Sequence, residues 1–130
     1  MQEIIVEKLK KERGIAIGKP GVRFTYKSLY INARAGKMLT TDYITISVMN
    51  DATLHAMRLI PSSKECPNSF KLSDVCETNG AKRIETNRSL EAILNAGFPK
   101  SLLGKYLPAI RLFDGSLLIN IDEEQFFNKE

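Results

Sequence analysis

The residues best suited to contact a ligand in this chain are basic, and the first group of them alternates with aromatic residues. Arg23 and Lys27 are interleaved with Phe24 and Tyr26, and Lys19 precedes them. Because side chains alternate between the two faces of a strand, we expect Arg23 and Lys27 to share one face, with Lys19 near the tip of the preceding turn. A basic ribbon of this kind can contact the phosphates of a nucleic acid.

A second group of basic residues surrounds the start of a predicted helix. Lys82 and Arg83 belong to a predicted short strand, and Arg88 stands in the first turn of the helix, whose free N–H groups also favour an anion. Lys100 lies close to Phe98, so a charge stands near an aromatic ring. The alternative for each group is a solvated basic surface without a ligand. The predicted nucleic-acid or anion-binding residues are Lys19, Arg23, Lys27, Lys82, Arg83, Arg88 and Lys100.

The stretch GIAIGKPGVRFTY, residues 14–26, has the outline of a phosphate-binding loop without its chemistry. A P-loop follows the pattern G-x-x-x-x-G-K-[S/T], in which the hydroxyl binds magnesium. Here the glycine spacing is one residue short, and Pro20 replaces the hydroxyl residue and has no N–H group to donate. We instead predict a hairpin of strands at 15–17 and 22–26, with Pro20 and Gly21 in a type II turn that requires a positive φ at Gly21.

Residues that commonly carry catalysis are scarce. The chain has one histidine, His55, and two cysteines, Cys66 and Cys76, which together are too few for a four-ligand zinc site. A Cys-His pair would need one of the cysteines to lie beside His55, and a serine hydrolase would need a G-x-S-x-G elbow, which the chain lacks. We therefore predict a non-catalytic protein without a cofactor or metal.

Hydrophobic periodicity and turn residues predict the elements that position these groups. Asn32 is expected to cap a short helix over 33–39, and Asn87 a second helix over 88–96 that Gly97 ends with a positive φ. Turns at Asn50-Asp51 and Asp114-Gly115 complete a second and a third hairpin. Tyr43 and Tyr106 are expected to flank the core. The predicted strands are 15–17, 22–26, 28–32, 42–49, 54–60, 69–72, 82–85, 106–113 and 116–121.

These elements predict the fold class. The 130 residues, of which 43% are hydrophobic and 26% charged, suit a single globular domain over 1–130, with an N-terminal segment 1–13, a core 14–121 and an acidic tail 122–130. We expect a β-rich α+β domain of three hairpins and two short helices. The stretches 28–60 and 82–121 share one order of elements, which favours a pseudo-duplicated β-α-β-β unit, built as a barrel or a sandwich.

Charge is distributed unevenly along the chain. The net charge is +4, but residues 1–113 carry eighteen Lys and Arg against ten Asp and Glu, whereas 114–130 carry one against five. A basic body with an acidic tail suits a polyanionic partner, and the alternative is a merely solubilising surface. With no apolar run as long as a membrane span and no signal-peptide pattern, we expect the cytoplasm and no membrane partner.

The pattern also resembles a family of small bacterial and phage proteins of unknown function. The resemblance covers residues 22–121 and implies no catalytic residue. Its motifs are a strand that leads into a small-residue helix, an aromatic-led strand, a strand that ends near a proline, a second helix and a terminal hairpin. The matching residues are Leu29-Tyr30-Ile31-Asn32, Ala33-Arg34-Ala35, Tyr43-Ile44, Leu59-Ile60-Pro61, Thr86-Asn87-Arg88-Ser89-Leu90 and Leu117-Leu118-Ile119.

Together these patterns predict a small nucleic-acid-interacting or regulatory protein of bacterial or phage type. The alternative is a protein-interaction module, such as a phage-encoded inhibitor that binds a host defence nuclease. Nucleic acid and a host protein are thus the two expected partners. The oligomeric state stays open, and a dimer is among the alternatives.

Overall fold

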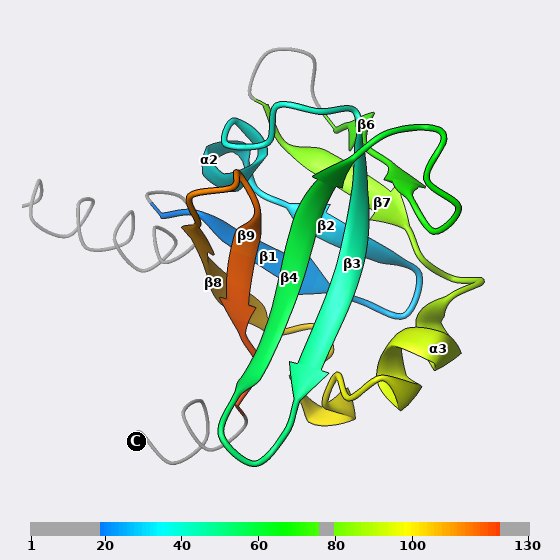
Figure 1. Ribbon diagram of the computed structural model, residues 1–130, viewed down its shortest axis with the longest axis vertical. Coiled ribbons are helices and arrows are strands. Elements are labelled where there is room, and N and C mark those ends of the chain that lie inside the picture. Colours follow the sequence, from blue (N-terminus) through cyan, green and yellow to red (C-terminus); the bar gives the residue numbers. More distant parts are fainter. Residues whose placement is uncertain (1–18, 76–79, 123–130) are drawn as a thin grey trace, which may run out of the picture.

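Nine antiparallel strands form one strongly curved sheet in the computed structural model, which describes residues 19–75 and 80–122 (Figure 1). Every pairing between these strands is antiparallel. The elements in chain order are β1 (Gly21–Phe24), β2 (Ser28–Ile31), α2 (Ala33–Gly36), β3 (Tyr43–Asn50), β4 (His55–Ser62), β5 (Phe70–Lys71), β6 (Ser73–Asp74), β7 (Lys82–Glu85), α3 (Leu90–Asn95), the 3-10 helix η1 (Lys100–Leu102), β8 (Tyr106–Arg111) and β9 (Leu117–Asn120).

The sheet nearly closes on itself. Its strand order is β5-β3-β4-β9-β8-β1-β2-β7-β6, and the two strands at its ends are consecutive in the chain, separated by Leu72 alone. The backbone N–H of Leu72 donates to the carbonyl of Asp42, and its side chain is buried. The short segment 70–74 therefore connects the two ends of the sheet, which protects most strand edges from outside pairing.

The core lies inside this curved sheet because apolar residues occupy every second position of its strands. Leu29 and Ile31 of β2 are fully buried, and the prediction that they share an inner face is confirmed. At one end of the molecule the ring of Phe98 packs against Phe24 of β1, with 4.8 Å between the ring centroids. Burial of such side chains contributes roughly 1.5–3 kcal/mol each to folding, so the core dominates the stability of the fold.

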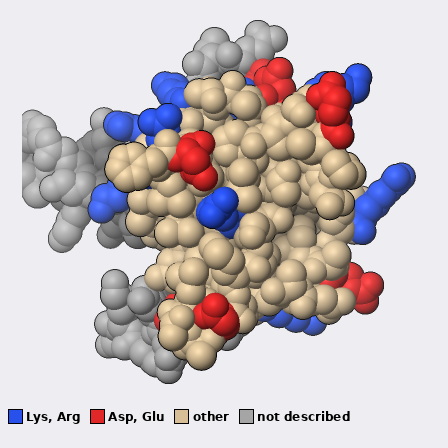
Figure 2. Space-filling model, in the orientation of Figure 1, with Lys and Arg blue, Asp and Glu red and all other residues tan. Residues whose placement is uncertain are grey.

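The outer surface over β3 and β4 is mainly uncharged. Figure 2 shows basic and acidic groups mostly around the margin of this face, without a single-sign cluster. The opposite side of the molecule, which is formed by β1, β2, β7 and β8, carries the groups considered below.

Two of the predicted hairpins are confirmed. β3 and β4 pair along their whole length around the turn that begins at Asn50, and β8 and β9 pair around Asp114-Gly115. Gly115 has a φ of 87°, as a tight Asp-Gly turn requires, and Gly97 ends the second helix with a φ of 124°. These signals are local in sequence, and tertiary contacts agree with them.

The first predicted hairpin is wrong in its turn. Gly21 does not have a positive φ and is the first residue of β1, so Pro20 and Gly21 do not form a type II turn. β1 pairs with β2 on one side and with β8 on the other, which leaves no place beside it for another strand. The expected strand 15–17 lies outside the described residues. The strand predicted over 22–26 ends at Phe24, and Lys27 belongs to the turn before β2.

The two helices are shorter than predicted, and one predicted cap is wrong. Asn32 does cap α2, but α2 ends at Gly36 rather than at residue 39. Asn87 caps nothing, because α3 begins only at Leu90 and follows Ser89, whose side chain makes no capping hydrogen bond. The chain turns first at the buried Thr86, whose carbonyl accepts from the Ser89 N–H. None of the helices in the described residues is long and apolar enough to cross a membrane.

Two strand predictions also differ from the structure. The expected strand over 69–72 is split into β5 and β6, because its two halves pair with different neighbours, β3 and β7. The return strand of the second hairpin extends beyond residue 60 to Ser62, and Pro61 lies within it opposite Ile44.

Candidate nucleic-acid interface

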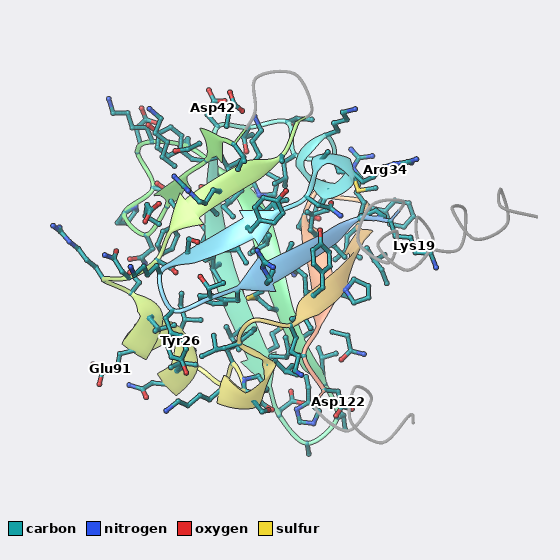
Figure 3. All side chains as sticks on the ribbon, turned by 180° about the vertical axis from the view of Figure 1, so that it is seen from behind. Lys19, Tyr26, Arg34, Asp42, Glu91 and Asp122 are labelled. Atoms are coloured by element: carbon teal, nitrogen blue, oxygen red, sulfur yellow. The ribbon has the colours of Figure 1, made fainter. Side chains whose placement is uncertain are left out.

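Four outward-facing side chains form a continuous row across four neighbouring strands. Tyr106 of β8 lies opposite Arg23 of β1, Arg23 lies opposite Tyr30 of β2, and Tyr30 lies opposite Arg83 of β7. Residues that are directly opposed in a sheet project from the same face, so aromatic rings and guanidinium groups alternate along it. We call these four residues the tyrosine–arginine row. Figure 3 shows this side of the molecule, with the four strands next to one another.

The row is positioned by the buried residues that alternate with it. Val22 and Phe24 flank Arg23 in β1, and Leu29 and Ile31 flank Tyr30 in β2; all four are fully buried. Because the inner residues are held by the core, the pleat directs Arg23 and Tyr30 outward. The row therefore rests on the regular part of the sheet rather than on a loop.

The side chains of Arg23 and Tyr30 contact one another. The guanidinium carbon of Arg23 lies 5.8 Å from the centre of the Tyr30 ring, within the range of a cation–π interaction. Neighbouring strands are about 4.8 Å apart, so the row extends for roughly 14 Å from Tyr106 to Arg83. This length suits a ligand that is longer than a single small molecule.

The ring of Tyr106 lies against the backbone of β1 at Gly21. A Cβ atom on Gly21 would lie only 2.3 Å from the Cε1 atom of Tyr106, so glycine leaves the space that the ring occupies. Burial raises the pKa of the Tyr106 phenol, and the neighbouring Tyr30 raises it further. A hydrogen bond with Asn32 and the charge of Arg23 lower this pKa. The net shift is upward, so the phenol is neutral at physiological pH and adds no negative charge to the row.

A small pocket adjoins Tyr106 at one end of the row. Its volume is ≈ 240 Å³, and its lining among the described residues is Lys19, Pro20, Tyr106 and Pro108. The lining combines one aromatic ring and two proline rings with a single exposed ammonium group. It suits a flat, apolar group that has an anion next to it.

A pocket of ≈ 240 Å³ is smaller than most sites for drug-sized ligands. It suits a single flat ring rather than a large molecule.

Glu85 reduces the positive charge at the other end of the row. The Nε atom of Arg83 lies 3.3 Å from the Oε2 atom of Glu85, and both side chains are more than half exposed. An exposed ion pair of this kind contributes little to stability and exchanges readily with solvent or a ligand. Arg23 forms no ion pair among the described residues, so its charge faces the solvent.

The structure brings some of the predicted binding residues together and separates others. Lys19 lies beside Tyr106, and Arg23 and Arg83 belong to the row. Lys82 does not join Arg83, because it lies at the alternate position of β7 and forms an ion pair with Asp74. The predicted cluster around Lys82 is therefore split between two faces of the sheet.

The other predicted residues lie outside the row. Lys27 is exposed in the turn between β1 and β2, and Lys100 is exposed at the start of η1. Arg88 is exposed shortly before α3 and forms no ion pair within the described part of the chain. Figure 3 places Lys19 and Glu91 of α3 at opposite sides of this face, so Arg88 and Lys19 cannot belong to one compact site.

Sequence reasoning missed Tyr30 and Tyr106 as members of the site. Tyr30 stands between two buried residues of β2, and this alternation alone indicates that it faces outward. Tyr106 was expected to flank the core, and the structure places it on the outer face against Gly21. The sequence holds no signal that β8 lies beside β1, so the row could not be found from it.

The histidine and the cysteines do not form a site in the described residues. His55 opens β4 and contacts Asn50, whereas the exposed Cys66 lies in the loop beyond the other end of β4. Hydrogen bonding with Ser63 lowers the pKa of the Cys66 thiol. Cys76 lies outside the described residues, among which no three His, Cys, Asp or Glu side chains are grouped as metal ligands.

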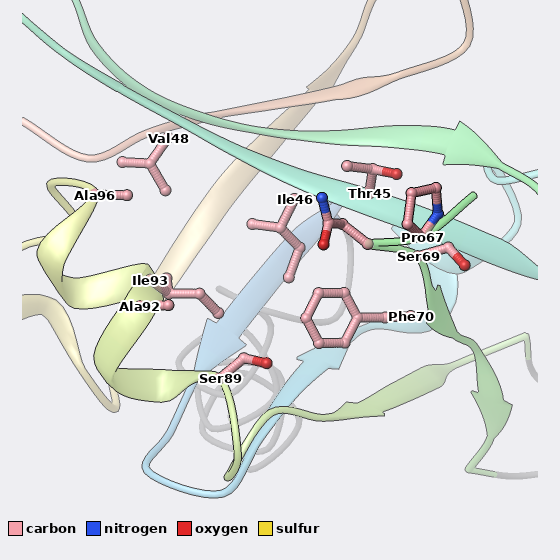
Figure 4. Close-up of a pocket in the computed structure, with 11 residues that line it drawn as sticks. Thr45, Ile46, Val48, Pro67, Ser69, Phe70, Ser89, Ala92, Ile93 and Ala96 are labelled. Atoms are coloured by element: carbon pink, nitrogen blue, oxygen red, sulfur yellow. The ribbon is translucent and has the colours of Figure 1, made fainter.

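A groove lies between β3 and α3, away from the row. Its volume is ≈ 390 Å³, and Phe70, Ile46 and Ile93 point into it (Figure 4). β3 pairs with β5 only at Tyr43 and Ile44, so within residues 19–75 and 80–122 the edge of β3 that faces α3 has no partner strand beyond Ile44. The groove thus combines a partly apolar lining with a strand edge that is unpaired within the described residues.

Comparison of the chain with family models, with curated proteins and with solved structures found no match.

Proposed function

We propose that this protein is non-catalytic and binds nucleic acid through the tyrosine–arginine row. The observation that carries the proposal is the alternation of Tyr106, Arg23, Tyr30 and Arg83 on one face of the sheet. Guanidinium groups bind phosphates, and aromatic rings provide surfaces for bases. Lys19 adds a further cation at one end of the row.

The charge of the molecule supports this proposal. Residues 19–75 and 80–122 contain fourteen Lys and Arg against eight Asp and Glu, an excess of six positive charges. A net positive body attracts a polyanion over a distance of about one Debye length, roughly 8–10 Å. The proposal includes a regulatory role of this binding in a bacterium or a phage.

Salt dependence tests the proposal. We expect a fluorescein-labelled oligonucleotide to bind at low salt, with an affinity that falls linearly on a logarithmic salt scale. Reversal of charge in Arg23→Glu/Arg83→Glu should weaken binding and lower the salt slope by about 1 per lost phosphate contact. Fluorescence anisotropy measures both quantities.

The matched control is Lys64→Glu/Lys71→Glu, which changes the net charge equally at two exposed residues outside the row. We expect this variant to keep most of the affinity. Equal losses in the two variants would show that only net charge matters, and the absence of binding by the unmodified protein at low salt would refute the proposal.

A protein-interaction module is the second candidate function, and the free edge of β3 favours it. The N–H of Asp51 donates to the carbonyl of the opposite residue, Leu54. Because hydrogen-bonded pairs alternate along an antiparallel ladder, the backbone groups of Thr45 and Ser47 also bond to β4. The backbone groups of Ile46 and Val48 then point away from β4 into the groove. An extended peptide of a partner protein, such as a host nuclease, would add there as a strand with apolar side chains toward Phe70.

Blocking the groove tests this second candidate. Ala92 lines the groove from α3 and is exposed, so Ala92→Arg should fill the groove without loss of folding. Asn95→Arg adds the same charge at an exposed position that does not line the groove, and serves as the control. A nuclease-treated pull-down should recover a partner with the control but not with Ala92→Arg; equal recovery by both would exclude the groove.

We also infer that the fold is a barrel built from two copies of one β-α-β-β unit. The segments β2-α2-β3-β4 and β7-α3-β8-β9 have the same order, and β2 pairs with β7 as β4 pairs with β9. Both pairs are antiparallel, as a twofold axis between the copies would require. β1 lies between β2 and β8, and the segment 70–74 lies at the equivalent place between β7 and β3. Because β5 and β6 are only two residues long, they leave most of the edge of β3 unpaired.

A further inference from the structure

The two tyrosines of the row are spaced for separate planar groups rather than for one. Tyr106 and Tyr30 lie on either side of β1, and Arg23 stands between them. Two strand spacings place their backbones about 10 Å apart. In a duplex the faces of the bases are covered by stacking on neighbouring bases, so a duplex cannot present two base faces to the two rings.

The pocket beside Tyr106 provides a place for one of these groups. Gly21 supports the ring of Tyr106, and Pro20 and Pro108 line the same pocket with apolar rings. Lys19 contributes an ammonium group at this pocket, where it can contact a phosphate attached to the bound base. The neutral phenol avoids repulsion of that phosphate.

We infer that the row binds single-stranded nucleic acid, with one unpaired base in the pocket beside Tyr106 and a second base on or near Tyr30. This inference rests on the proposed nucleic-acid function and specifies its ligand. Arg23 contacts the backbone between the two bases, and Lys19 contacts it beside the pocket. Stacking on aromatic side chains is sequence-tolerant, so we expect weak base preference.

Intrinsic fluorescence tests the inference directly. The chain has no tryptophan and four tyrosines, so tyrosine emission can be observed without interference. We expect oligothymidylate to quench this emission and to bind more tightly than a duplex of the same length. Thymidine monophosphate, which offers one base and no chain, should bind far more weakly than the oligonucleotide.

Substitutions separate stacking from charge. Tyr106→Leu should lower the affinity for oligothymidylate by about fivefold to 100-fold, while Tyr106→Phe should retain it. Tyr26→Leu is the control, because Tyr26 is 60% exposed in the turn between β1 and β2 and lies outside the row. If Tyr106→Leu fails to fold by circular dichroism, Tyr30→Leu replaces it with the same expected loss.

The outcomes distinguish this inference from the function on which it rests. Equal affinity for single strand and duplex, with binding still lost in Arg23→Glu/Arg83→Glu, would overturn the stacking inference and leave the proposed function in place. Unchanged affinity in both Tyr106→Leu and Tyr30→Leu would likewise overturn it. A protein that binds neither nucleic acid at low salt would overturn both.

Discussion

Gly21 and Tyr106 depend on one another for their positions. The ring occupies the space that any side chain at residue 21 would take, and the carbonyl of Leu107 lies 3.1 Å from the same point. Gly21 is therefore required because the ring of Tyr106 lies so close to it. The turn pattern predicted a different reason, a left-handed backbone at Gly21, which the structure does not have.

We predict that Gly21→Ala destabilises the protein by about 1–3 kcal/mol, because the added methyl group must displace Tyr106. Chemical denaturation measures the free energy of unfolding. In a Tyr106→Ala background the cost of Gly21→Ala should fall, since the clash is absent. The same cost in both backgrounds would contradict this account.

The carboxyl group of Asp114 makes the stability of the protein depend on pH in acid. Its carboxylate accepts hydrogen bonds from the hydroxyl of Ser116 at 2.6 Å and from the Ser116 N–H at 2.9 Å, and these bonds lower its pKa below the ordinary 3.8, against a small opposing effect of burial. A lowered folded-state pKa adds stability above pH 3.8 that is lost as the pH falls through the folded-state value.

Ser116→Ala should raise the pKa of Asp114 toward 3.8 and reduce the loss of stability in acid. Carbon-detected NMR titration of the carboxyl groups measures the pKa. Asp51, whose pKa is lowered separately by backbone bonds from Thr53 and Leu54, is the internal reference and should not change. An unchanged Asp114 pKa in the variant would show that the Ser116 hydroxyl is not the cause.

At the scale of the elements, Asn32 connects three parts of the chain. Its side-chain oxygen accepts from the Ala35 N–H in α2 and from the Gly21 N–H in β1, and its amide donates to the carbonyl of Lys19. One buried side chain thus caps a helix and holds the start of the row.

We predict that Asn32→Ala costs about 1–3 kcal/mol, because it leaves buried backbone groups without partners. Asn87→Ala is the matched control and should change stability by less than about 0.5 kcal/mol, since Asn87 is exposed and caps no helix. Thermal and denaturant unfolding measure both. Equal effects of the two substitutions would restore the capping role that the sequence suggests for Asn87.

At the scale of the whole molecule, β3 has a long strand edge that pairs with no other strand of the described residues. The segment 70–74 connects β3 to β7 but covers only the first two residues of β3. The remaining edge faces the groove, where α3 contributes side chains but no strand.

We predict alternating amide hydrogen exchange along β3. The amides of Thr45 and Ser47 bond to β4 and should exchange at least about 100-fold more slowly than those of Ile46 and Val48, which face the groove. Residue-resolved exchange by NMR measures the four rates in one sample. Equal protection at all four amides would mean that the edge of β3 is already paired.

Much of the fold could be predicted because its signals are local. The alternation of buried Leu29 and Ile31 identifies β2, and Asp114-Gly115 identifies the last turn, since each depends on residues close together in the chain. The prediction that Asn87 caps the second helix was wrong because an asparagine before a helical pattern is only one way to begin a helix. Here the chain bends at Thr86 and starts α3 later.

The sequence by itself determined which residues of β1 and β2 face the core, because the alternation of apolar residues there has the same period as the pleat. It therefore determined that Arg23 and Tyr30 face outward. Only the tertiary structure decided that they are neighbours of Tyr106 and Arg83, because strand order and register depend on pairings between residues far apart in the chain. The period of a strand specifies a face but not the strand beside it.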